Sequence, residues 1–531
     1  MFNSYSFFSL TFLLLFSFSS SAETQSSESN DPEIDCINNA KRLLIEHDQT
    51  VSSGITFNNC LKVSSGNNPL VWFFTGYMKL KGIGATPNYD EALKFITKAA
   101  DSNLAIAQKE LSDFYMTGGG INKKIDVFQA VKWLQQLANN ENKQLKDDAA
   151  FKLCAIYLYG TGIPVNYEDA FFWCKKSALD NHNSDGLTNL AYMYINGYGV
   201  EKNIPIAIDY YKIAANKGNI SAQISLGRAY STGKDLDFNY PEAFFWMNKA
   251  AEQQNPLAIY YLAQMYEYGN GTEKNPEKAF KLYTKSAELG NSQAQYTLGR
   301  WYQYSTKPNL DLAAKWYHKA AKQNNSNAMI AIAEMYRKQN TKEMILWFQR
   351  AAELGNKQGN KQLMQIFLNG TNETSAKPNL AFEQAKLLAD ENDPDGMYWL
   401  SYFYLHGIGT TKDISKAREV LIPLIQEGNT QAKVGLAQIK LEENDLAGAI
   451  SQLLDIAEIG CLYNSCSTLA EAYNKEKNFS EAYFWFLVGN SMEESITEKD
   501  KELIKQIESK ISQQKQLEIK NRVIHWIESK Q

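Results

Sequence analysis

The sequence contains no run of basic residues and no large excess of charge of either sign. Its 531 residues include 54 Lys and Arg against 59 Asp and Glu, which gives a formal net charge of −5. Nucleic-acid binding requires a concentrated positive surface, so we expect no nucleic acid among the partners. Disordered chains contain few aromatic residues, whereas aromatic residues make up 12% of this sequence. That amount is enough for a large buried core.

Histidine is scarce, and no catalytic or metal-binding motif is visible. The five His lie far apart, at His47, His182, His318, His406 and His525. No His-Glu-x-x-His motif, nucleophile elbow or Cys/His/Asn arrangement occurs. The cysteine spacing is that of neither a metal site nor a Cys-x-x-Cys redox motif. We therefore expect no enzymatic activity, no cofactor and no metal.

Long apolar runs are also rare, but one lies at the N-terminus. Residues 7–18 (FFSLTFLLLFSF) are uncharged and largely apolar, and Ser20-Ser21-Ala22 follow them. The run is shorter than the roughly 20 residues that span a bilayer. We predict a signal peptide over residues 1–22, a disordered linker over 23–33, no stable membrane span after cleavage, and export to a periplasm or beyond the cell. An uncleaved anchor is the alternative, because no Lys or Arg precedes the run.

The six cysteines form three pairs of near neighbours along the chain. These pairs are Cys36/Cys60, Cys154/Cys174 and Cys461/Cys466. An even number of cysteines in an oxidising compartment suggests disulfides, the first two each closing a helical hairpin. The third pair requires Cys461 to lie in the loop before a helix, because residues five apart on a helix point to different faces. Two buried free thiols are the alternative for each pair.

Paired glycines recur along the chain at a nearly fixed interval. Gly269-Asn270-Gly271 between apolar segments resembles the start of a phosphate loop. The first glycine of such loops falls at Gly160, Gly197, Gly233 and Gly269, in steps of 37, 36 and 36 residues. A phosphate loop follows a strand and occurs once per domain, whereas a period of this length indicates stacked supersecondary units.

Each unit is predicted to be a helix, a loop and a second helix. The first glycine can adopt the left-handed conformation that ends a helix. Asn275-Pro276-Glu277 then provides a capping residue, a proline at the first helical position and an acidic first turn. The small residue that follows Leu in the first helix, such as Gly227 or Gly299, is expected to face an alanine of the partner helix.

This pattern resembles the Sel-one-like repeat, a relative of the tetratricopeptide repeat. One unit carries the motif at Leu226, Gly227, Tyr230, Gly233, Ala243, Trp246, Lys249, Ala250 and Ala251. The resemblance covers residues 69–491 and implies an all-α, right-handed superhelix of about twelve helix pairs. It also implies a non-catalytic scaffold that binds proteins, in its exported bacterial form at the envelope or the host interface. A peptidoglycan-binding or peptidoglycan-modifying protein is one alternative, and an adaptor of the endoplasmic reticulum lumen is a second.

The predicted units begin near Pro69, Leu104, Asp148, Ser184, Ile220, Pro256, Ser292, Ser326, Lys357, Pro394, Thr430 and Cys461. Helix phase is least certain over residues 302–392, where paired glycines are missing. Residues 34–68 are expected to form an N-terminal helical cap, and residues 492–531 capping helices. A coiled-coil handle for dimerisation is the alternative for this tail; otherwise we expect a monomer.

The first helices are expected to line a concave surface. Two of their positions, just before Leu and just before the first Gly, are not needed by the repeat motif and share a face. Aromatic residues, which are favoured at protein-binding hot spots, occupy several of them. The hypothesis is a groove for a protein partner lined by Tyr159, Tyr261, Tyr268, Tyr304 and Trp399. The alternative is that these rings pack between adjacent repeats.

Overall fold

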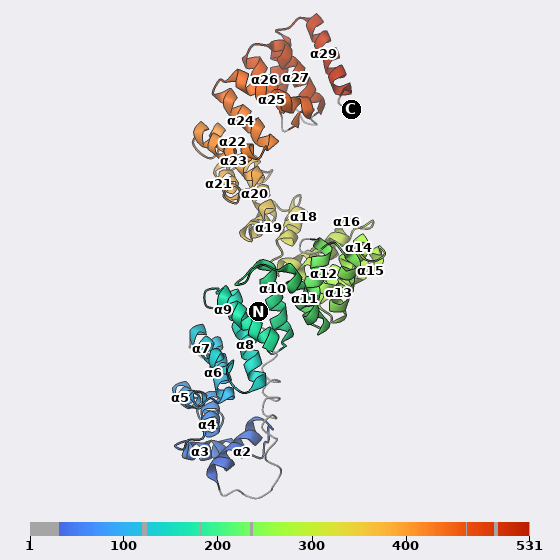
Figure 1. The fold of residues 1–531 in the computed structure, drawn as a ribbon. Helices are drawn as coiled ribbons and strands as arrows, with labels where there is room; N and C mark the ends of the chain where they lie inside the picture. The colour runs from blue at the N-terminus through green and yellow to red at the C-terminus, as the bar shows by residue number, and fades with distance from the viewer. Residues whose placement is uncertain are drawn as a thin grey trace. The chain divides into compact units, whose positions relative to one another are not determined.

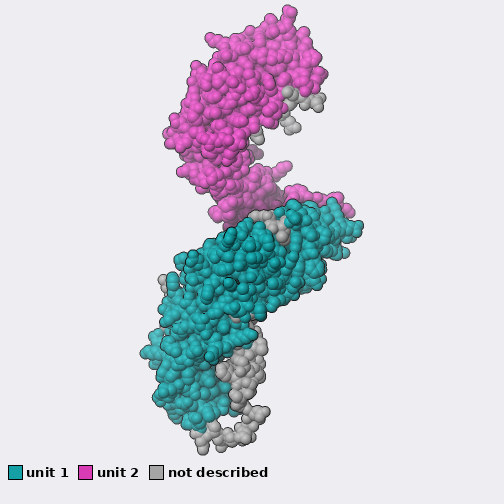
Figure 2. All heavy atoms as spheres, viewed as in Figure 1, with its two compact units in different colours: residues 1–286 teal, residues 287–531 magenta. Residues whose placement is uncertain are grey.

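The computed structural model describes residues 31–118, 125–180, 182–233, 237–462, 465–492 and 498–529. The predicted signal peptide lies outside these ranges. Within them all regular structure is helical and no strand occurs, which confirms the all-α prediction (Figure 1). The chain divides into two compact units, unit 1 (residues 1–286) and unit 2 (residues 287–531) (Figure 2).

Twelve consecutive helix pairs run from α4 to α27, as predicted. The first helices are α4 (Pro69–Lys81), α6 (Ala105–Thr117), α8 (Lys143–Tyr159), α10 (Ser184–Asn196), α12 (Ile220–Thr232), α14 (Pro256–Tyr268), α16 (Ser292–Tyr304), α18 (Ser326–Tyr336), α20 (Lys357–Asn369), α22 (Pro394–His406), α24 (Thr430–Glu442) and α26 (Ser465–Lys475). The second helices are α5 (Tyr89–Asp101), α7 (Val127–Leu137), α9 (Tyr167–Lys175), α11 (Ile204–Asn216), α13 (Tyr240–Glu252), α15 (Pro276–Glu288), α17 (Leu310–Ala321), α19 (Thr341–Glu353), α21 (Pro378–Asp390), α23 (Ile414–Gln426), α25 (Leu446–Gly460) and α27 (Phe479–Met492). A short π-helix, Lys176–Asp180, continues α9.

Helices also flank the twelve pairs at both ends. They are α2 (Pro32–Leu44) and α3 (Ser53–Val63) at the N-terminal end, and α28 (Glu498–Glu508) and α29 (Gln513–Glu528) at the C-terminal end. Helix α2 begins at Pro32, inside the stretch predicted to be disordered, because Asp31 caps it by accepting a hydrogen bond from the Glu33 N–H at 2.9 Å. Helix α8 begins at Lys143, before the predicted start at Asp148.

The helix caps follow the sequence signals. In α14, Gly269 has a left-handed backbone (φ 81°), and its N–H donates to the carbonyl oxygen of Met265. Asn275 accepts a hydrogen bond from the N–H of Lys278 at 2.9 Å and so caps α15. These local bonds fix where each helix of a pair stops and starts.

The second glycine of each loop has a different role from the first. A Cβ atom on Gly199 would overlap the carbonyl oxygen of Tyr167, at the start of the second helix of the preceding pair. A Cβ atom on Gly271 would likewise overlap the carbonyl oxygen of Tyr240. Both glycines also have a positive φ. In these loops the second glycine therefore allows the loop to seat directly on the backbone of the neighbouring repeat, whereas a Cβ atom on Gly162 would meet the side chain of Val127.

Contrary to the prediction, Gly227 and Gly299 inside the first helices do not face alanines of the partner helix. A Cβ atom on Gly227 would lie 2.8 Å from the side chain of Met247, and one on Gly299 would lie 2.6 Å from the ring of Tyr317. The prediction is wrong at these positions because the eighth residue of the second helix is bulky and fills the space that the glycine leaves. Each pair thus packs one small residue against one large residue, which keeps the core dense.

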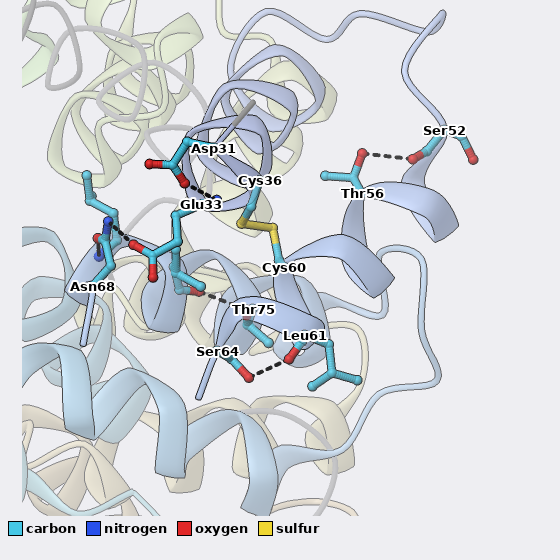
Figure 3. The surroundings of a disulfide bond; sticks show 12 residues. Asp31, Glu33, Cys36, Ser52, Thr56, Cys60, Leu61, Ser64, Asn68 and Thr75 are labelled. Atoms are coloured by element: carbon cyan, nitrogen blue, oxygen red, sulfur yellow. Dashed lines mark hydrogen bonds between the residues drawn. A yellow bond between two sulfur atoms is a disulfide. The ribbon is translucent and has the colours of Figure 1, made fainter. Parts of the chain in front are cut away.

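All three cysteine pairs are joined by disulfides in the structure. Cys36–Cys60 connects α2 to α3 (Figure 3), and Cys154–Cys174 connects α8 to α9, with Cα–Cα distances of 4.9 and 4.7 Å. Cys461 directly follows α25 in a left-handed conformation (φ 46°), which lets it reach Cys466 in α26. It lies in the connection before α26, as the third pairing requires.

First helices of successive pairs contact one another directly. In unit 1, α8 contacts both α6 and α10, and in unit 2, α24 contacts both α22 and α26. Among the described residues, no two second helices contact each other as extensively. Such contacts are expected where first helices line the inner side of a solenoid, so we call the face that the first helices leave uncovered the inner surface.

Candidate protein-binding surface

The uncovered face of each first helix is a single stripe. In α14 the second, sixth, ninth and thirteenth residues are Leu257, Tyr261, Gln264 and Tyr268, none of which is fully buried. Their spacing of four, three and four residues places them on one helix face. We call these four positions of a first helix its inner stripe. The two positions considered from the sequence are the sixth and the thirteenth.

Tyr159 is the last residue of the longer helix α8 and precedes Gly160 as Tyr268 precedes Gly269, so we count it with the inner stripe; it is 59% exposed. Its hydroxyl donates a hydrogen bond to Asn189 Oδ1 on α10 at 3.2 Å. Burial and the neighbouring phenol of Tyr192 raise the pKa of Tyr159. The ring therefore spans two successive repeats and still presents more than half of its surface to solvent.

The two predicted residues of α14 differ in their exposure. Tyr261 is half-buried, packs against the cluster that contains Met247 and Met265, and contacts the ring of Tyr260 at 5.6 Å between centroids. Tyr268 ends the helix and is 65% exposed. Tyr261 thus fits the alternative interpretation, in which rings pack between repeats, whereas Tyr268 is available to a partner.

The two predicted residues of unit 2 show the same contrast. Tyr304 ends α16 and is 72% exposed. Trp399 in α22 is half-buried and packs against the surrounding core. Its ring meets Tyr402 edge to face at 5.5 Å, and Tyr402 in turn lies 4.3 Å from the ring of His406. Trp399, Tyr402 and His406 occupy the last three positions of the inner stripe of α22.

The five predicted residues are divided between the two units. Three belong to unit 1 and two to unit 2. Among the described residues, no ring contact joins two of these five residues. Instead, Tyr159 and Trp399 have neighbours on the stripe that the sequence reasoning missed, namely Tyr192 and Tyr402. Both lie at the ninth helix position, and the four-three-four spacing is the signal that could have found them.

A second aromatic surface lies on the loop edge of unit 1 and was also missed. The ring of Tyr198, between the glycines of its loop, stacks on the ring of Tyr167 at 4.3 Å. Beside it, Phe128, Val165 and Tyr167 line an open pocket of about 680 Å³. Stacking of one repeat on the next creates this contact, so no single repeat motif predicts it.

Charged groups at one part of the inner surface are paired with one another. Asp113 of α6 contacts the ammonium groups of Lys109 at 2.7 Å and of Lys152 on α8 at 3.2 Å. Burial alone would raise the pKa of Asp113, but these two cations hold it below its ordinary value. At this part of the inner surface the charges are therefore compensated, whereas Arg228 of α12 and Arg300 of α16 are exposed at the ninth stripe position.

The described residues contain no cluster of three or more His, Cys, Asp or Glu side chains suited to a metal ion. No described helix is both long and apolar enough to cross a bilayer.

A family model described as "Sel1 repeat" matches more than half of the chain. The matched segments are residues 73–104, 105–142, 147–182, 184–219, 220–255, 256–291, 292–325, 327–356 and 394–419. The structure adds three helix pairs of the same kind that the family model does not match, α20–α21, α24–α25 and α26–α27.

Two solved structures from bacteria have a similar fold. A Sel1 repeat protein from Oxalobacter formigenes is 23% identical and superposes with a TM-score of 0.51, over 66% of this chain and 98% of its own. A protective antigen of uropathogenic Escherichia coli strains, which displays an SLR fold, is also 23% identical, with a TM-score of 0.48 over 89% of this chain and 94% of its own. At this level of identity the likeness concerns the fold alone.

Proposed function

Since this chain belongs to the Sel1 repeat family, whose solenoids typically mediate protein–protein interactions, we propose that it is an exported, non-catalytic scaffold. It holds a protein partner against the inner stripes of its first helices. The main support is the exposure of three tyrosines that end first helices, 59% for Tyr159, 65% for Tyr268 and 72% for Tyr304. Exposed rings at these positions are not required by the repeat core, and Tyr is among the residues that dominate protein-binding energetics.

Export is supported by the cysteines. All six lie in disulfides, and disulfides persist in oxidising compartments outside the cytosol. The apolar run and cleavage site predicted from the sequence agree with this location. A chain extracted from cells under thiol-blocking conditions should carry no alkylated cysteine if it is exported, and six if it stays in a reducing compartment.

Site-specific photocrosslinking in the native cell tests the proposed binding surface. A benzophenone amino acid replaces Tyr268 in one variant and Tyr304 in another, and Phe245, which is 47% exposed on the second helix α13, serves as the control. We expect the same protein to be crosslinked at both tyrosine positions and not at Phe245. Equal crosslinking at all three positions, or at Phe245 alone, would contradict binding at the inner stripes.

A further inference from the structure

The inner stripe of α20 consists entirely of side-chain amides. Its second, sixth, ninth and thirteenth residues are Gln358, Gln362, Gln365 and Asn369. Gln358, Gln365 and Asn369 are exposed, and Gln362 is half-buried and accepts a hydrogen bond from the Arg337 guanidinium at 2.7 Å. A primary amide offers two donors and one acceptor oxygen, so this stripe can bond to N–H and C=O groups alike.

A pocket of about 530 Å³ lies beside this amide stripe. It lies between the C-terminal end of α18, the start of α19 and the loop after α20, and Met344 and Ile366 form its apolar part. Gln365 and Asn369 of the stripe also line it. The connection between α18 and α19 is short and lacks the paired glycines of other repeats.

On the other side of α20 lies the aromatic stripe of α22. The Lys361 ammonium joins the two helices through an ion pair with Asp395 at 2.6 Å. The rings of Trp399 and Tyr402 meet edge to face, so they offer edges and a narrow ridge rather than a flat platform. A saccharide ring prefers to stack on a flat, open aromatic face, and this arrangement favours a peptide instead.

Two cations beside the stripe are already compensated. The Arg337 guanidinium forms a two-pronged pair with Glu334 at 2.6 Å, and Lys361 contacts Asp393 as well as Asp395. From these two cations a ligand therefore gains no new charge pair, and the nearby charges that are unpaired among the described residues, Lys338 and Glu373, lie at the pocket.

Two of the three steps between the amides of the α20 stripe match the repeat of a peptide backbone: residues four apart on a helix, such as Gln365 and Asn369, rise by about 6 Å, and peptide groups on one side of an extended chain recur every ~6.6 Å. The three-residue step from Gln362 to Gln365 rises by only about 4.5 Å.

From this geometry we infer that α20 and α22 form a groove that holds an extended peptide segment of the partner by its backbone. The amides of α20 bond to the main chain, the rings of α22 flank it, and the pocket beside Met344 receives one side chain of the peptide. This inference rests on the proposed function and specifies the ligand class at one part of the inner surface.

The test uses the full chain and a phage-displayed library of random decapeptides. The best binder is resynthesised with both ends blocked, and its dissociation constant is measured by calorimetry. We expect the double variant Gln365→Ala/Asn369→Ala to bind at least tenfold more weakly. The matched control Gln349→Ala, which removes an exposed amide on α19, should change the dissociation constant by less than about twofold. N-methylation of single backbone amides should weaken binding at least tenfold at two or more positions.

A conservative variant separates recognition from stability. Gln365→Glu preserves the side-chain shape but removes both N–H donors, so it should also weaken binding while the circular dichroism spectrum stays unchanged. Unaltered affinity in these variants would overturn the inference. Binding of soluble peptidoglycan fragments that is lost in the double variant would also overturn it, in favour of a carbohydrate site. If the library yields no binder while a partner is still crosslinked at Tyr268, this inference fails and the proposed function stands.

Discussion

Two glycines of one loop should differ sharply in their tolerance of a methyl group. Gly197 ends α10 with φ 71°, and the atom nearest to a Cβ placed there is 3.6 Å away. Alanine at Gly197 therefore costs only the strain of a left-handed backbone, about 1–2 kcal/mol. Gly199 has a similar φ of 65°, but its Cβ would overlap the backbone carbonyl of Tyr167. Backbone cannot rotate away as a side chain can, so overpacking adds roughly 1–3 kcal/mol.

Native-state hydrogen exchange is the suitable assay for this pair of variants. Repeats contact only their neighbours, so the effect should be confined to α9, α10 and the adjoining helices. Since each 1.4 kcal/mol corresponds to a factor of ten, we expect exchange in these helices to accelerate about tenfold in Gly197→Ala and about a hundredfold or more in Gly199→Ala. If hydrogen exchange accelerated equally in the two variants, the close approach to Tyr167 would not be the reason for a glycine at position 199.

Three further perturbations test other parts of the account. Asn275→Ala removes the cap of α15 and should reduce stability by about 1 kcal/mol, measurable as a lower urea midpoint. Replacing Cys154 and Cys174 together by Ala opens a loop of about 20 residues and should cost roughly 3 kcal/mol, with no further loss at this site when reductant is added. Burial opposes ionisation of Asp113, but the ammonium groups of Lys152 and Lys109 lower the pKa of its carboxyl group below the ordinary value. Its stabilising contribution is therefore present above the unfolded pKa near 4 and lost as pH falls through the lower folded value, so Asp113→Asn should flatten the pH dependence of stability below about pH 4.

The helix pairs could be predicted from the sequence because their signals are local. A capping Asn such as Asn275, or a glycine at the left-handed end of a helix such as Gly269, acts within one turn of the backbone. The same signals then recur from one repeat unit to the next. Even in the stretch without paired glycines, α18 and α20 begin at the predicted residues Ser326 and Lys357.

Contacts between helices could not be predicted in the same way. Which residue faces Gly227 depends on the rotation of two helices about their axes, and the structure places Met247 there instead of an alanine. The stack of Tyr198 on Tyr167 arises only when one repeat seats on the next. The pocket beside α20 is lined by residues of two successive repeats, so the motif of one repeat does not predict it.

The account rests on the claim that exposed rings on the inner stripes serve binding rather than folding. The most direct measurement compares the wild-type chain with the double variant Tyr268→Ala/Tyr304→Ala, using the partner identified by crosslinking. We predict that the dissociation constant rises at least tenfold, the effect of losing a hot-spot side chain, while the Tm changes by less than about 2 °C. A fall in Tm of many degrees, or an unchanged dissociation constant, would contradict the claim.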